Sequence, residues 1–125
     1  MSLLLGIAQL LLAVAFGMAG SMKTFTPIEA LAQQMPWVAR MPELIRFIGI
    51  SELAGAAGMI LPALTRIKPS LTPLAAWGFV VIMILATIFH AARGEWSAVP
   101  ATIVLGLLAA FVGWGRTRKA PIAPR

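Results

Sequence analysis

Residues 43–62 read ELIRFIGISELAGAAGMILP, and this stretch decides the fold because it is apolar and long enough to cross a membrane. It nevertheless contains two charged residues, Arg46 and Glu52. A rise of about 1.5 Å per residue places Glu52 about 12 Å beyond Leu44 along a helix. An unpaired charge at the centre of a bilayer costs about 2.5–3.5 kcal/mol. Glu52 is therefore the first candidate for a functional residue.

The composition of the whole chain is typical of a membrane protein. Of 125 residues, 60% are hydrophobic and 11% are charged, whereas soluble domains average about 45–50% apolar and about 25% charged residues. The absence of cysteine excludes an intrachain disulfide, a thiol redox relay and a thiolate metal site. The net charge of +6 is spread over loops and tail without stacking aromatic residues among the basic ones. Nucleic acid is therefore not expected as a partner.

Four segments are long and apolar enough to span a hydrocarbon core of about 30 Å. Because lipid offers no water to the backbone amides, each segment must be a helix. The sequence predicts an all-α fold, an integral membrane four-helix bundle in one domain over residues 1–114, followed by a basic, disordered cytoplasmic tail over 115–125. The first segment ends in AGS, as a signal peptide does, but no basic residue precedes it, so we expect it to be retained. The four segments are residues 3–22, 44–64, 71–92 and 98–114.

A short interfacial helix is predicted between the first two spans. The sequence TPIE at residues 26–29 has the form of a capping box, with threonine as N-cap, proline at the first helical position and glutamate at the third. We expect a helix over residues 27–34 that ends before Pro36. Trp37 is then placed to sit among the lipid headgroups.

The basic residues near the helix ends predict the orientation. Positive residues are more frequent in cytoplasmic loops, and the two sides of the bundle carry six and four of them. This bias places both termini in the cytoplasm and the protein in the inner (plasma) membrane. The six are Arg66, Lys68, Arg116, Arg118, Lys119 and Arg125, and the four are Lys23, Arg40, Arg46 and Arg93.

The topology predicts one polar network or ligand site in the outer half of the bundle, formed by Lys23, Arg46, Glu52, His90 and Glu95, with no equivalent in the cytoplasmic half. Glu52 could pair with Lys23 or His90, and Arg46 could reach Glu95 or the headgroups; the sequence leaves these pairings open. Alternatively, Lys23 and Arg46 snorkel to the headgroups, His90 is an ordinary interfacial residue, and Glu95 only shapes a turn. For Glu52 the alternative to a functional role is a purely structural interhelical bond. No metal site is expected, because His90 and two glutamates would be its only ligands.

The glycines of the second span are predicted to serve helix packing. Small residues let helix backbones approach closely where lipid provides no hydrophobic drive between helices. The glycines concerned are Gly49, Gly55 and Gly58.

These motifs together resemble the DoxX-like family of small four-helix membrane proteins. The string R-x-x-G-x-x-E-x-x-G-A-x-G-x-x-L-P runs from Arg46 to Pro62, G-M-A-G-S-M-K ends at Lys23, and H-x-x-x-G-E runs from His90 to Glu95. The resemblance implies the four-helix fold. For function it implies less, because relatives have been linked with quinol oxidation, with redox and oxidative-stress complexes and, in an animal branch, with assembly of ligand-gated ion channels.

Three functions follow as hypotheses. The first is an accessory component of a membrane redox complex that binds a quinone or another lipophile in the outer leaflet. In this role His90 or Lys23 would donate a hydrogen bond to a carbonyl and Glu52 would relay a proton. The second is a noncatalytic assembly or chaperone-type interaction protein. The third is a small proton-coupled transporter, although the first span has no charge before Lys23. Expected partners are the lipid bilayer, a membrane protein partner and a second copy in a dimer, and no catalytic residue is assigned.

Overall fold

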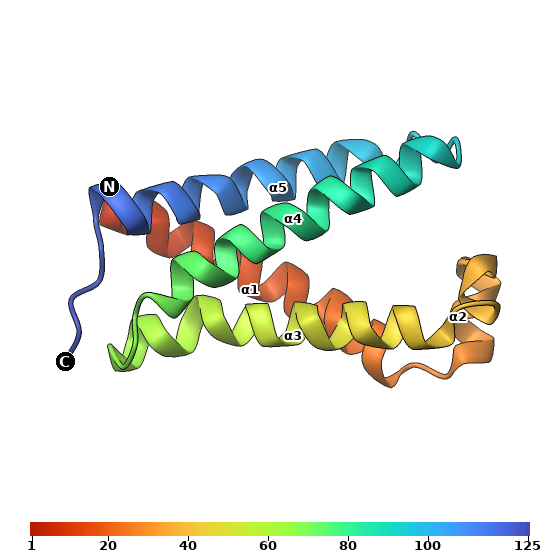
Figure 1. Ribbon diagram of the computed structural model, residues 1–125, viewed down its shortest axis with the longest axis horizontal. Helices are drawn as coiled ribbons and strands as arrows, with labels where there is room; N and C mark the ends of the chain where they lie inside the picture. Colours follow the sequence, from red (N-terminus) through yellow and green to blue (C-terminus); the bar gives the residue numbers. More distant parts are fainter.

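Four long apolar helices run side by side in an all-helical bundle (Figure 1). The structure is a computed structural model and describes residues 1–125. All four helices are long and apolar enough to cross a membrane, the last with its continuation to Lys119. The predicted four-helix membrane bundle is therefore confirmed, and the chain is a multi-pass membrane protein. The long helices are α1 (Ser2–Phe25), α3 (Pro42–Thr65), α4 (Leu71–Ala92) and α5 (Val99–Trp114).

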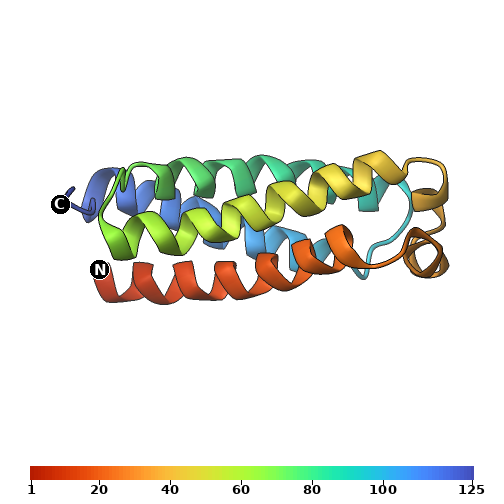
Figure 2. The ribbon, with the colours of Figure 1, turned by 90° about the horizontal axis from the view of Figure 1, so that it is seen from below.

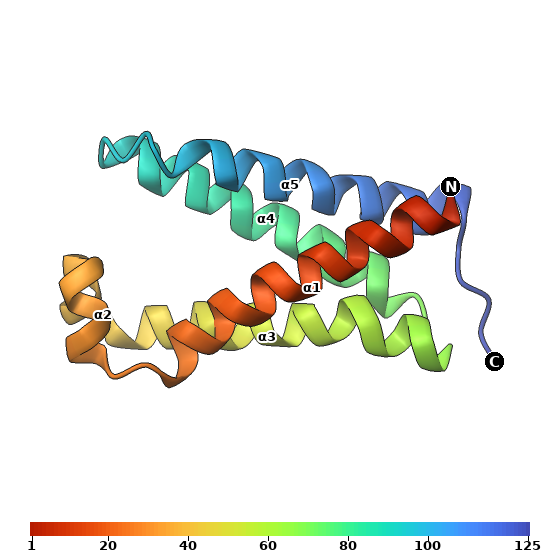
Figure 3. The same cartoon turned by 180° about the vertical axis from the view of Figure 1, so that it is seen from behind.

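The helices form two pairs, because α1 packs mainly on α3 and α4 packs mainly on α5. Seen from below, α1 and α3 run alongside each other (Figure 2). Seen from behind, α1 crosses the bundle obliquely (Figure 3). The N-terminal end of α1 lies beside α5, and the C-terminal end of α1 lies beside the start of α3. Both chain termini lie at one end, which we call the terminal end (Figure 1). The opposite end, which holds α2 and the α4–α5 turn, is called the α2 end.

The main core lies where the two helix pairs meet. Its centre is a stacked aromatic pair, Phe16 of α1 and Phe79 of α4, whose ring centroids are 3.9 Å apart. Most other large apolar side chains are exposed, as expected of helices that face lipid tails rather than water. Nine buried residues make up this core, namely Ala8, Leu12, Phe16, Met59, Ala76, Phe79, Met83, Ala109 and Val112.

The connection between α1 and α3 folds into a small cap at the α2 end. It contains α2 (Ile28–Gln34) and a 3₁₀ turn, η1 (Pro36–Ala39), so the predicted interfacial helix is present. The expected capping box does not form, because the helix begins after Pro27 and no side chain caps it. Trp37 packs edge-on against Phe89 of α4, with 5.1 Å between ring centroids. The cap thereby joins the two helix pairs.

The glycines of α3 lie where neighbouring helices come closest. An added Cβ at Gly49 would lie 2.8 Å from the Cβ of Lys23, and one at Gly55 would meet the ring of Phe79. Gly58 likewise lies against α4. Any side chain at these positions would push α3 away from its neighbours.

The last helix differs from the predicted boundary at Trp114. A π-helical turn, η2 (Gly115–Lys119), continues α5, so part of the predicted disordered tail is helical. The turn is held in place because Gly115 packs against Leu5 of α1 and Arg116 is buried, with 8% of its surface exposed. Beyond it, the amide of Arg125 donates to the carbonyl of Arg66.

Candidate functional site

The α2 end contains a buried ion pair between α1 and α3. The Nζ atom of Lys23 lies 2.8 Å from Oε1 of Glu52. Glu52 is 1% exposed, while the Lys23 side chain is 21% exposed. The helices can approach this closely because Gly20 of α1 faces the backbone of α3, where an added Cβ would lie 2.8 Å from the carbonyl oxygen of Gly49. Of the two partners left open by the sequence, Glu52 pairs with Lys23.

Arg46 completes this cluster by binding the end of α1. Its Nη1 donates to the carbonyl oxygens of Lys23 at 2.9 Å and Thr24 at 2.7 Å. The last carbonyls of a helix have no partner within it and carry partial negative charge, so a cation is favourable there. Arg46 thus caps α1 from the neighbouring helix and does not contact Glu95. We call Lys23, Arg46 and Glu52 the charged cluster.

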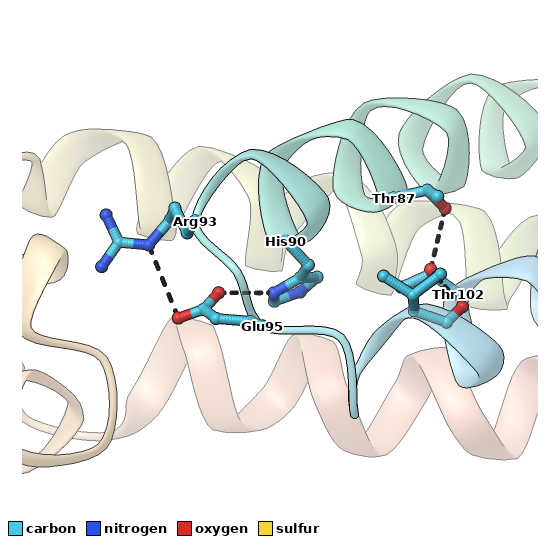
Figure 4. A network of polar contacts seen from close by, with 6 residues as sticks. Thr87, His90, Arg93, Glu95 and Thr102 are labelled. Atoms are coloured by element: carbon cyan, nitrogen blue, oxygen red, sulfur yellow. Dashed lines mark hydrogen bonds and ion pairs between the residues drawn. The ribbon is translucent and has the colours of Figure 1, made fainter.

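A second, separate group of polar side chains lies at the α4–α5 turn (Figure 4). Nδ1 of His90 lies 2.8 Å from Oε1 of Glu95, and Nε of Arg93 lies 3.5 Å from Oε2. Because an ionised carboxylate only accepts, Nδ1 is the donor. The hydrogen bond from His90 holds the pKa of Glu95 below its ordinary value of 4.5, with partial burial opposing and Arg93 adding to the shift.

Two threonines join α4 to α5 one turn deeper in the same view (Figure 4). The hydroxyls of Thr87 and Thr102 are 2.8 Å apart, and the carbonyl oxygens of Met83 and Val99 lie 2.7 and 2.8 Å from them within their own helices. Because each hydroxyl has a single hydrogen, one of them donates across to the other helix while the other donates to the carbonyl of its own helix. These bonds hold the hairpin together independently of the turn.

The five residues predicted as one network therefore form two groups. Lys23, Arg46 and Glu52 come together between α1 and α3, whereas His90 and Glu95 pair with each other at the α4–α5 turn. No hydrogen bond or ion pair joins the two groups. The two helix pairs diverge at the α2 end, and η1 lies against α4 there (Figure 1). Sequence spacing could not show this divergence.

The terminal end holds a buried polar pair that contradicts the prediction of polarity in one half only. Nε of Arg116 donates to Oε1 of Gln9 at 2.6 Å, and Nε2 of Gln9 donates to the carbonyl oxygen of Met59 at 2.7 Å. Gln9 is 3% exposed. A lone glutamine inside the otherwise apolar first span was the available signal, because a buried amide requires partners.

The described side chains do not assemble a metal site, since no group of three histidine, cysteine, aspartate or glutamate residues lies close enough to hold an ion. The charged cluster instead makes interhelical contacts in which each charged group has a partner.

A comparison with known protein families identifies the family of this bundle. A model of the DoxX-like family matches residues 7–112. This chain belongs to the DoxX-like family. The match covers the charged cluster and Gln9 of this DoxX-like protein, but it ends before Arg116. Searches of the curated proteins and of the solved structures found no match.

Proposed function

We propose that this DoxX-like protein is a noncatalytic membrane component, a rigid bundle that associates with the transmembrane helices of a partner. The observation that supports this most is the charged cluster. Glu52 is paired with Lys23 at 2.8 Å, and Arg46 binds two carbonyls of α1. These contacts use the charges to join helices.

The outer face of α3 suits contact with another helix. Ala54 and Ala57 are exposed on it between the larger Ile50 and Leu61, which are 57% exposed each. Small residues in lipid let a second helix approach closely, and van der Waals contact then replaces the missing hydrophobic drive. A partner protein or a second copy of this chain would use the same face.

The rival function is quinone or lipophile binding in an accessory subunit of a redox complex. The donors that a quinone carbonyl would need, Lys23 and His90, are already bound to Glu52 and Glu95 at 2.8 Å. The remaining N–H groups of Lys23 could still donate to a quinone carbonyl, but Glu52 would have to leave Lys23 in order to relay a proton to the quinone. A proton-coupled transporter would likewise have to release Glu52 from Lys23 in each cycle, so both rivals require a rearrangement that a structural role does not.

The orientation with both termini in the cytoplasm of the inner membrane is part of the proposal. All four acidic residues, Glu29, Glu43, Glu52 and Glu95, belong to the α2 end, together with four basic ones. The terminal end has six basic residues and no acidic one. Because positive charge is retained on the cytoplasmic side, the terminal end is expected there.

The Glu52→Gln variant tests the structural role against ligand binding. Glu43→Gln is the matched control, because Glu43 is an exposed glutamate on the same helix. Thermal unfolding in detergent and mass spectrometry of extracted lipophiles are measured on all three proteins. We expect only Glu52→Gln to lower the Tm, with no stoichiometric quinone in any of them. A wild-type protein that carries a quinone, lost in Glu52→Gln at unchanged Tm, would overturn the proposal.

Association is tested by photo-cross-linking in native membranes. A photoreactive residue at Ala57 of α3 is compared with one at Leu107, which is 67% exposed on α5. We expect a discrete adduct from Ala57 only, with the mass of a second copy or of another membrane protein. Cross-linking to lipid alone from both positions would contradict the proposal.

A further inference from the structure

Arg116 is a buried cation without an acidic partner. It is 8% exposed, and none of the ion pairs of the protein includes it. Its acceptors are neutral oxygens, the nearest being the side chain of Gln9 at 2.6 Å and the carbonyl of Ala120 at 2.9 Å, followed by the hydroxyl of Ser2 at 3.0 Å. Buried charges are normally paired because their desolvation is expensive. The unbalanced charge therefore favours an anion at this place.

The guanidinium also retains donor capacity. It has five N–H groups, and those of Nε and Nη1 reach Gln9, Ser2 and the carbonyl of Ala120 at 2.6–3.0 Å. Nη2 has two N–H groups, and its one acceptor is the carbonyl oxygen of Ser2 at 3.4 Å. This nitrogen can donate to a further oxygen without losing an established bond.

A groove of about 410 Å³ lies beside Arg116 and Gln9, between α1 and α3. Its walls include Gly6 and Leu10 of α1 together with Ile60 of α3. Nothing lies within 4 Å of a Cβ added at Gly6, so this glycine leaves the groove open. Because α1 rises about 1.5 Å per residue, the groove extends about 10 Å from Ser2 to Gln9. It combines an apolar wall with a cation at the terminal end of the bundle.

We propose that this groove binds one molecule of an anionic phospholipid, with the phosphate at Arg116 and an acyl chain along Gly6, Leu10 and Ile60. Charge complementarity selects the headgroup, since the acidic residues of the chain all belong to the opposite end and the π-helical turn that holds Arg116 also contains Arg118 and Lys119. Basic pockets between transmembrane helices on the cytoplasmic side suit anionic headgroups. The apolar wall favours a lipid over a free anion.

The test uses the full-length protein in neutral detergent. Native mass spectrometry counts adducts during titration with a phosphatidylglycerol, a phosphatidylcholine of the same chain length, or inorganic phosphate. Gly6→Leu fills the groove, and Gly78→Leu is its control, because a Cβ at Gly78 also meets nothing within 4 Å. Arg116→Gln removes the buried charge, and Arg118→Gln removes an exposed one on the same turn.

We expect wild-type protein to retain one phosphatidylglycerol, about tenfold more tightly than phosphatidylcholine. Both lipids offer a phosphate to Arg116, but the choline cation of phosphatidylcholine cancels the net negative charge and is repelled by the guanidinium. Gly6→Leu and Arg116→Gln abolish this preference, while both controls keep it within about twofold. Equal binding of the two lipids, loss of preference in Arg118→Gln, or unchanged binding by Gly6→Leu would overturn the proposal. Displacement by inorganic phosphate at the same concentration would also overturn it, since it would show an anion site without a lipid chain. If Arg116→Gln does not fold, the comparison of Gly6→Leu with its control Gly78→Leu decides whether the groove binds the lipid.

Discussion

Replacing Lys23 with methionine is expected to destabilise the bundle more than replacing its partner Glu52 with glutamine. The reason is the unequal burial of the two side chains, which are 21% and 2% exposed respectively. Without Lys23, the carboxylate of Glu52 stays buried with no cation. Without the charge of Glu52, Lys23 can extend its ammonium toward the headgroups.

The expected magnitudes follow from this asymmetry. Removal of one partner from a buried ion pair costs about 3–5 kcal/mol, and Lys23→Met is expected near the lower end of this range. Glu52→Gln loses mainly one interhelical contact, which in a bilayer is worth about 0.6–1.7 kcal/mol. The double variant Lys23→Met/Glu52→Met removes both charges, and an apolar replacement of a buried pair is often close to neutral. It is therefore expected within about 1 kcal/mol of wild type.

The free energy of unfolding is measured by SDS titration in mixed micelles, followed by tryptophan fluorescence. Glu43→Gln serves as control and is expected within about 0.5 kcal/mol of wild type, because it changes an exposed side chain. The reasoning is refuted if Lys23→Met and Glu52→Gln cost the same. It is also refuted if the double variant is no more stable than the worse single variant.

Two further predictions concern the contact between α1 and α3 at Gly49 and the pH dependence of the α4–α5 turn. Gly49→Ala is expected to destabilise the bundle by about 1–3 kcal/mol in the same titration, because its Cβ would lie 2.8 Å from the Cβ of Lys23. A Cβ added at Gly6 meets no atom within 4 Å, so Gly6→Ala should instead stabilise the bundle by up to about 1 kcal/mol. Equal changes in the free energy of unfolding for Gly49→Ala and Gly6→Ala would contradict this account. Since the pKa of Glu95 is lowered from 4.5, its contribution to turn stability is complete above that pH and is lost as pH falls through the lowered pKa. Carboxyl carbon shifts in NMR should show a midpoint below 4.5 that rises in His90→Ala; an unchanged midpoint would exclude the His90 hydrogen bond as the cause.

The helical spans were predictable because their signal is local. A bilayer requires roughly 20 consecutive apolar residues in each helix, so hydropathy along the chain is enough to locate α1, α3, α4 and α5. The interfacial helix α2 was predicted from its proline and flanking residues, but the expected threonine cap was wrong because the helix begins one residue later, after Pro27. The π-helical turn η2 was missed, since a basic stretch with glycine has the composition of a tail.

The pairing of polar residues was only partly predictable. Helix order shows that Lys23, Glu52 and His90 belong to the same end of the bundle, but not which of them meet. The divergence of the two helix pairs at the α2 end separates His90 from Glu52, and the close contact at Gly20 and Gly49 brings Lys23 to it. Both depend on crossing angles, which the hydrophobic pattern leaves undefined.

The amino-acid sequence by itself determined that this protein is a DoxX-like bundle of four membrane-spanning helices, because burial in lipid depends on composition over short segments. Only the tertiary structure decided which charges are neutralised. Glu52 pairs with a cation, Lys23, on the neighbouring helix. Arg116 is held by neutral groups alone, among them Gln9, which lies 107 residues away in the chain. An electrostatic partner is chosen by distances of a few ångströms in space, and those distances exist only after the helices have packed.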